Sequence, residues 1–173
     1  MPTFFTVEKI QRQLIDIRAA RCRAAQPIPA LKFHPADEAL APGAEQPGYD
    51  DSAWPDIHVG DAWGGYDVTA WFRARVPVPP EWRGRQLALH FQVGPKDDGD
   101  GAAEAMLYLA GQPLQALDTW HEEAWLLPEH LAAGALDVAI QAWSGVYHIP
   151  DRRRLALAQL EWKIGRASCR ERV

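Results

Sequence analysis

A period-two alternation of apolar and polar residues restricts the fold of this chain more than any other feature. The alternation recurs in three stretches, residues 72–78, 87–93 and 136–142, with turn-forming residues between them. In the second stretch, two leucines, a phenylalanine and a valine alternate with alanine, histidine and glutamine. Such alternation is typical of strands with one face in a core and the other toward solvent.

A helical period precedes the strands. From Thr6 to about Ala25, apolar residues recur at spacings of three and four, and Thr6 is placed as an N-cap. The apolar positions are Val7, Ile10, Leu14 and Ile17. Prolines at 27 and 29 end the pattern, because proline cannot continue the backbone ladder. This amphipathic helix needs a partner surface, either its own sandwich or the remainder of the chain or another subunit.

The whole pattern predicts a mainly β chain. Residues 27–163 contain about six or seven short strands with turns every ten residues or so, which favours a jelly-roll β-sandwich. One N-terminal amphipathic α-helix, within residues 1–26, precedes it. The phrase at 50–54, Asp-Asp-Ser-Ala-Trp, is common before the first core strand of sugar-binding jelly rolls, and Trp54 there is expected to fill the core.

The last ten residues, 164–173, match an in-frame translation of a common sequencing-adapter oligonucleotide. We therefore expect this segment to be an artefact and the natural sequence to continue differently after Lys163. The alternative is a genuine basic tail. Without the segment, which carries three Arg and one Glu, the net charge changes from −5 to −7. Cys22 then remains as a lone cysteine, which cannot form an internal disulfide and fits a reducing compartment.

Composition excludes several classes of protein. Hydrophobic residues at 47% and charged residues at 24% are ordinary for a soluble domain. No apolar run approaches the roughly 20 residues of a membrane helix, and the N-terminus lacks a signal-peptide pattern. An acidic chain without a basic stripe is a poor candidate for nucleic acid or anionic membrane. We expect a cytoplasmic protein.

The sequence contains no self-sufficient catalytic motif. Its six histidines lack metal-site spacing, and neither a phosphate-binding glycine loop nor a Gly-x-Ser-x-Gly elbow is present. The acidic loop at 96–101 lacks the ligand spacing of an EF-hand. We predict no catalytic residue and no metal site in these residues.

The central stretch, Glu104 to Trp125, is predicted to be a hairpin with its turn at Ala110-Gly111 and a polar exit at 118–122. Aromatic faces near turns can stack on sugar rings, and the polar exit can add hydrogen bonds. The candidate substrate-binding residues are Trp63, Tyr66, Asp118, Trp120, His121 and Trp125. The structural alternative is that these aromatic and polar groups only pack the corner of a sandwich.

Three segments in the same order carry a family resemblance: Asp61–Gly65, Trp71–Gly84 and Glu104–Trp125. They resemble the N-terminal β-sandwich of the glycoside hydrolase family 38 α-mannosidases, of the cytosolic and vacuolar class II type. The resemblance covers most of Phe4 to Trp162 and departs from the family pattern at Lys96–Ala103, where this chain has its acidic loop.

The resemblance implies that the full-length protein hydrolyses terminal α-mannose residues of oligosaccharides. It also implies zinc and an Asp nucleophile in a following catalytic domain that opens near a His-x-His-x-Asp motif, which this chain lacks. The expected partners are that downstream domain, the oligosaccharide and further copies of the chain in a homo-oligomer. These residues alone are expected to be inactive.

Two other interpretations stay open. The chain fits a free-standing carbohydrate-binding module with no hydrolase attached. The phrase at 50–54 alone favours the sugar-binding sandwich of a β-galactosidase-like enzyme.

Overall fold

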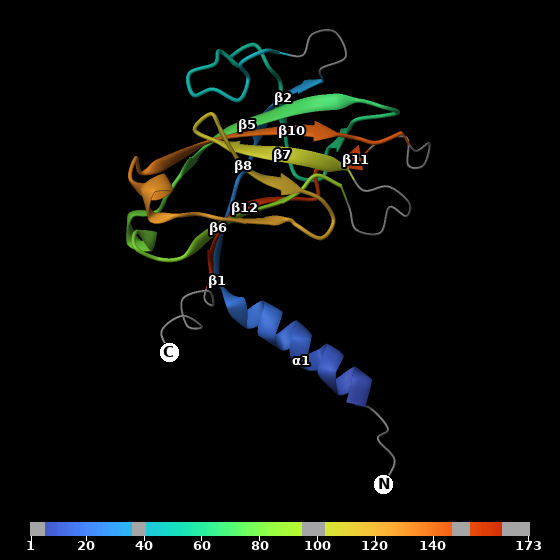
Figure 1. Ribbon diagram of the computed structural model, residues 1–173, viewed down its shortest axis with the longest axis vertical. Coiled ribbons are helices and arrows are strands. Elements are labelled where there is room, and N and C mark those ends of the chain that lie inside the picture. The colour runs from blue at the N-terminus through green and yellow to red at the C-terminus, as the bar shows by residue number, and fades with distance from the viewer. Residues whose placement is uncertain (1–5, 36–40, 95–102, 147–152, 164–173) are drawn as a thin grey trace.

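The computed structural model describes residues 6–35, 41–94, 103–146 and 153–163, with the side chains of 18 and 19 excepted. Two antiparallel sheets pack face to face, and one helix projects from the sandwich (Figure 1). The prediction of a mainly β sandwich preceded by one helix is confirmed. The acidic loop at 96–101 and the adapter-like segment at 164–173 lie outside the described residues.

The smaller sheet has four strands in the order β1-β12-β6-β9. Their bounds are β1 Cys22–Pro27, β12 Leu157–Lys163, β6 Leu87–Gln92 and β9 Glu123–Trp125. Each neighbouring pair is antiparallel. Strands from the two ends and the middle of the sequence therefore meet in this one sheet.

The larger sheet has six strands in the order β3-β2-β5-β10-β7-β8. Their bounds are β3 Asp56–Ile57, β2 Leu31–Pro35, β5 Thr69–Pro77, β10 Ala135–Trp143, β7 Glu104–Leu109 and β8 Gln112–Leu117. The remaining strands of the described residues form a two-stranded ribbon of β4 (Ala62–Trp63) and β11 (Arg153–Arg154). Two 3₁₀ turns are also present, η1 (Pro80–Trp82) and η2 (Pro128–Leu131).

The helix α1 runs from Thr6 to Arg21, so the predicted end near Ala25 is wrong. Cys22 begins β1, which pairs with β12 along its length. Backbone hydrogen bonds to a strand more than a hundred residues away outweigh the local helical preference of residues 22–25. Tertiary pairing of this kind overrides weak intrinsic propensity.

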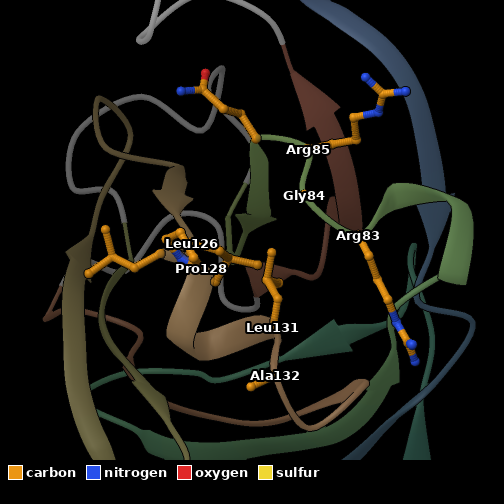
Figure 2. Close-up of a pocket in the computed structure, with 9 residues that line it drawn as sticks. Arg83, Gly84, Arg85, Leu126, Pro128, Leu131 and Ala132 are labelled. Carbon is orange, nitrogen blue, oxygen red and sulfur yellow. The ribbon is translucent and has the colours of Figure 1, made fainter.

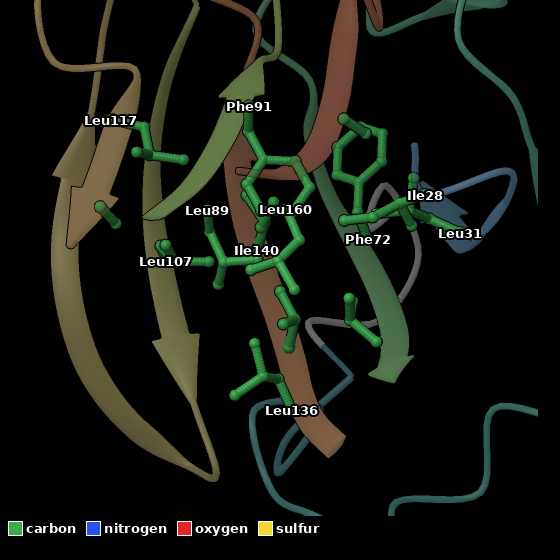
Figure 3. Packing of buried hydrophobic residues seen from close by; sticks show 14 of the residues in the cluster. Ile28, Leu31, Phe72, Leu89, Phe91, Leu107, Leu117, Leu136, Ile140 and Leu160 are labelled. Carbon is green, nitrogen blue, oxygen red and sulfur yellow. The ribbon is translucent and has the colours of Figure 1, made fainter. Parts of the chain in front are cut away.

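The core lies between the two sheets, where the apolar positions of the alternating stretches meet. Leu89, Phe91 and Leu160 of the smaller sheet face Leu107 and Ile140 of the larger one (Figure 3). All five side chains are almost completely buried. Sheet packing of this type produces one continuous core from inward-facing residues.

A second, smaller core covers the outer face of the larger sheet. It contains Trp54, Trp71 and Ala139, and Trp54 is buried as predicted. The neighbouring Asp51 accepts a hydrogen bond of 2.8 Å from Arg73 Nε. The Asp-Asp-Ser-Ala-Trp phrase therefore closes this face of the sheet in a structural manner.

The predicted central hairpin is present as β7 and β8. Its turn falls at Ala110-Gly111, where both residues have positive φ, +49° and +81°. A two-residue connection with positive φ at both positions matches the twist of the flanking strands. The position of this turn was fully predictable from the sequence.

The glycine at 64 is required by close packing. Its φ is +75°, and a Cβ built there would lie 2.7 Å from Cβ of the buried Ser144. Ser144 Oγ donates to the Gly65 carbonyl at 2.7 Å and accepts from the Val68 amide at 3.0 Å, so this side chain cannot yield cheaply.

Gly64→Ala should therefore lower the free energy of unfolding by about 2–4 kcal/mol, from overpacking added to backbone strain. Gly43→Ala is the matched control, because φ there is +84° but nothing lies within 4 Å of the added carbon. Urea unfolding of both variants measures the difference. Equal losses in the two variants would show that the contact with Ser144 does not matter.

Candidate functional site

A large polar hollow lies on the outer face of the smaller sheet. It is a pocket of about 650 Å³ bordered by β6, β9 and β12, the loop at 118–122 and the junction of α1 with β1. Its lining contains acids, bases, amides and two tryptophans. We refer to it as the polar pocket.

Strand alternation places the side chains of the pocket. In β6, Leu87, Leu89 and Phe91 face the core, so His90 and Gln92 face outward. The same alternation in β12 and β9 brings Glu161, Lys163, Glu123 and Trp125 to the outer face. Pairing of the three strands then gathers these groups, which are far apart in the sequence.

A network of charges forms the floor of the pocket. His90 Nδ1 lies 2.9 Å from Glu161 Oε1, and His90 Nε2 lies 3.6 Å from Glu122 Oε2. Lys163 Nζ lies 2.6 Å from Glu123 Oε1 and also contacts Glu161 Oε2. Glu161 and Lys163 are both about 5% exposed, so Glu161 is compensated mainly by Lys163 and His90, and Lys163 by Glu161 and Glu123.

The network decides the ionisation of Glu161. Burial alone would raise the pKa of this carboxyl, but hydrogen bonds and charge from His90 and Lys163 outweigh it and lower the pKa from 4.5 to about 2. A carboxylate with a depressed folded-state pKa stabilises the fold above its unfolded-state value. The stabilisation by Glu161 is therefore lost as the pH falls from about 4.5 to about 2.

Glu161→Gln should therefore be destabilising near neutral pH, and its deficit relative to the unmodified chain should shrink as the pH falls from about 4.5 to about 2. Denaturant unfolding of both proteins at a series of pH values measures this difference. A deficit that is constant over the interval would show that Glu161 does not titrate in this way.

The pocket floor does not fit a metal ion. His90, Glu123 and Glu161 each offer one ligand atom, and these atoms lie within 4.8 Å of one another. However, the Lys163 ammonium contacts both carboxylates and already supplies the compensating positive charge. A divalent cation would have to displace a buried ammonium, and this cluster is therefore not a zinc-binding site.

The loop at 118–122 forms the rim of the pocket. Asp118 Oδ1 accepts hydrogen bonds from the amides of Trp120 at 2.7 Å and His121 at 2.8 Å, and His121 Nδ1 lies 3.0 Å away. The hydrogen bond with the His121 side chain is the main cause of a lowered pKa of Asp118. This local turn holds Trp120 outward with 88% of its surface exposed.

The six candidate residues do not form one site. Trp120, His121 and Trp125 line the polar pocket, and Asp118 supports the rim beside it. Trp63 is 2% exposed and donates its indole N–H to the Val93 carbonyl at 2.7 Å, so it is part of the core. Tyr66 is exposed on a different loop and does not line the polar pocket.

Sequence reasoning missed the floor of the pocket: His90, Glu161 and Lys163. His90 occupies an outward position of the predicted strand at 87–93, and this alternation was the available signal for it. Glu161 and Lys163 occupy outward positions of β12. The pairing of β6 with β12, which brings His90 opposite Gln159 and next to Glu161, is not readable from either strand alone.

A second pocket, of about 470 Å³, lies at the end of β9. Figure 2 shows Leu126 and Leu131 near its centre, with the guanidinium groups of Arg83 and Arg85 directed away from them. Among the described residues that line it, none carries a carboxylate, thiol or imidazole. Its chemistry suits apolar contact and no proton transfer.

Among the described residues, no helix is both long enough and apolar enough to cross a membrane; α1 has 16 residues and a polar composition.

Three solved structures with a similar fold come from glycosidases. The chain aligns with a β-glucuronidase from Bacteroides uniformis at TM-score 0.61 and 17% identity, covering 80% of this chain and 17% of that one. A β-glucuronidase from an uncultured Clostridium species aligns at TM-score 0.55 and 15% identity, covering 82% and 29%. A β-glycosidase from Bacteroides vulgatus aligns at TM-score 0.53 and 16% identity, covering 79% and 20%. These similarities define the class of fold, and the chain spans less than a third of each of these proteins.

The family is given by the sequence. Residues 36–146, more than half of the chain, match the family described as the jelly roll domain of alpha-mannosidase. The chain belongs to this family, and the resemblance that its three sequence segments indicated is confirmed. No match was found among curated proteins.

Proposed function

We propose that this chain is the N-terminal accessory domain of an α-mannosidase that hydrolyses terminal α-mannose of oligosaccharides in the cytoplasm or a similar compartment. The family match over residues 36–146 is the observation that carries the proposal. In this proposal the sandwich braces a zinc-dependent catalytic domain that follows it in the longer protein. The zinc and the nucleophile belong to that domain.

The polar pocket supports an accessory role. A retaining glycosidase needs one carboxylate free to attack the sugar and a second, protonated one to serve as the acid, roughly 5 Å apart. The buried Glu161 is engaged by His90 and Lys163, and Glu123 by Lys163 and Arg21. Carboxylates neutralised by fixed cations serve stability better than nucleophilic attack.

A second candidate function is carbohydrate binding without catalysis. Trp120 favours it, because an indole that is 88% exposed and held by a hydrogen-bonded turn beside a polar pocket suits stacking on a sugar ring. In this alternative the carboxylate and amide oxygens of the pocket would accept hydrogen bonds from sugar hydroxyl groups, and the amide N–H groups would donate hydrogen bonds to them.

The two candidates are separated by activity and by binding. The present chain should not hydrolyse an aryl α-mannoside with zinc added, whereas the protein extended past Lys163 to its natural stop codon should. Hydrolysis that copurifies with the present chain would contradict the accessory role.

Binding is tested by titrating the present chain with mannose and following tryptophan fluorescence. A saturable change that disappears in Trp120→Ala, while the variant keeps its unfolding midpoint, would favour the binding module. If mannose changes the tryptophan fluorescence of neither the present chain nor the Trp120→Ala variant, the accessory-domain function is favoured.

A further inference from the structure

The helix α1 carries an apolar face that the sandwich does not cover. Every side chain from residue 6 to residue 17 is exposed, and the helix projects away from the sheets (Figure 1). The apolar face consists of Val7, Ile10, Leu14 and Ile17, which are 64%, 51%, 48% and 59% exposed. We call these four residues the α1 stripe.

The root of α1 is fixed to the smaller sheet. Arg21, the last residue of the helix, donates from Nη2 to Glu123 Oε2 at 3.3 Å. Its guanidinium also lies over the Trp125 ring, 5.8 Å from the centroid. These two contacts of Arg21 fix the C-terminal end of α1 to the sheet. The helix also continues directly into β1 at this end.

The strand that ends the described chain arrives at the same root. β1 and β12 are antiparallel, and Cys22 is paired with Lys163. β12 therefore runs toward α1 and ends beside the first residue after the helix. Polypeptide that continues from Lys163 starts next to α1, where its effective concentration near the stripe is high.

A second copy of the chain fits the stripe less well. The four residues follow 3-4-3 spacing over 16 helical residues, about two heptads. Stable coiled coils sustain this pattern over roughly three to four heptads or more. The present chain also spans only 17% and 29% of two glucuronidases that share its fold, so each of those proteins carries much additional polypeptide.

We propose that the α1 stripe is the seat of the polypeptide that follows Lys163 in the longer protein, packed through an apolar face of its own. The inference rests on the proposed function, which places a further domain after this sandwich. It assigns the helix as the contact between the accessory domain and that domain.

Hydrogen exchange of the α1 amides tests the proposal, measured in the present chain and in the protein extended to its natural stop codon. We expect exchange to slow by about tenfold or more in the extended protein, because packing stabilises a helix against local opening. Ile10→Glu in the extended protein should remove most of this protection.

Ile15→Glu is the matched control. It makes the same substitution in the same helix, but Ile15 is 61% exposed and lies about 140° around the helix from Ile10, away from the stripe. The control should keep the protection. Equal loss in both variants would overturn the assignment of the stripe.

Two further outcomes would overturn the proposal: α1 amides that exchange equally fast in both proteins, or protection in the present chain that grows with concentration, which would make a second copy the occupant. Activity on an aryl α-mannoside is read separately in the unmodified extended protein. Activity with unprotected α1 refutes only this inference, whereas protected α1 without activity refutes only the proposed function.

Discussion

Lys163→Met should lower the free energy of unfolding by about 3–5 kcal/mol. The ammonium of Lys163 contacts two carboxylates, Glu123 and Glu161, and Glu161 is 5% exposed. Removing the cation leaves Glu161 in a buried position with less compensation, and the cost of an unpaired buried charge exceeds the cost of the lost contact itself. The pKa of Glu161 should rise in the same variant, because Lys163 is one of the groups that lower it.

Lys32→Met is the matched control for this loss. Lys32 Nζ lies 2.8 Å from Asp56, but the two side chains are 35% and 51% exposed. Exposed pairs of this kind contribute about 1 kcal/mol or less. Urea unfolding near neutral pH measures both variants, and similar losses would refute the role of burial.

A double variant separates the cost of losing the Lys163–Glu161 ion pair from the cost of leaving the buried Glu161 charge uncompensated. Lys163→Met combined with Glu161→Gln should cost less than the sum of the two single substitutions, since the glutamine carries no charge to strand. Additive losses would show that the two residues act independently.

Leu107→Ala should lower the free energy of unfolding by about 2–5 kcal/mol. Leu107 is completely buried in β7, at the centre of the core between the sheets (Figure 3). The loss combines the transfer free energy of the removed methyl groups with the cavity that rigid strands on both sides cannot close. The hairpin that contains Leu107 should keep its register, because its turn is unchanged.

Leu127→Ala makes the same change at a side chain that is 51% exposed. We expect a loss within about 0.5 kcal/mol there, as for most surface substitutions. Chemical denaturation of both variants measures the contrast. A small effect at Leu107 would mean that the two sheets do not share a tightly packed core.

Local sequence patterns predicted the elements of the fold because strand and turn preferences act over a few residues. The alternation in 87–93 and 136–142 became β6 and β10, and Ala110-Gly111 became the turn of the central hairpin. The end of α1 could not be predicted, since residues 22–25 are recruited by β12 from the opposite end of the chain.

The candidate site followed the same division. The rim of the polar pocket was predictable because Asp118, Trp120 and His121 belong to one local turn. The floor was not, because His90 and Glu161 are joined only through pairing of β6 with β12. Likewise, nothing local distinguishes Trp63, which is buried, from Trp120, which is exposed.

The sequence by itself determined the alternating strands β5, β6 and β10, the presence of the amphipathic helix, the central turn and the family to which the chain belongs. Only the tertiary structure decided which outward-facing groups meet in the polar pocket and that the α1 stripe is left uncovered. The physical reason is that periodicity fixes the face on which a side chain lies, whereas contacts between faces depend on long-range strand pairing that a single segment does not encode.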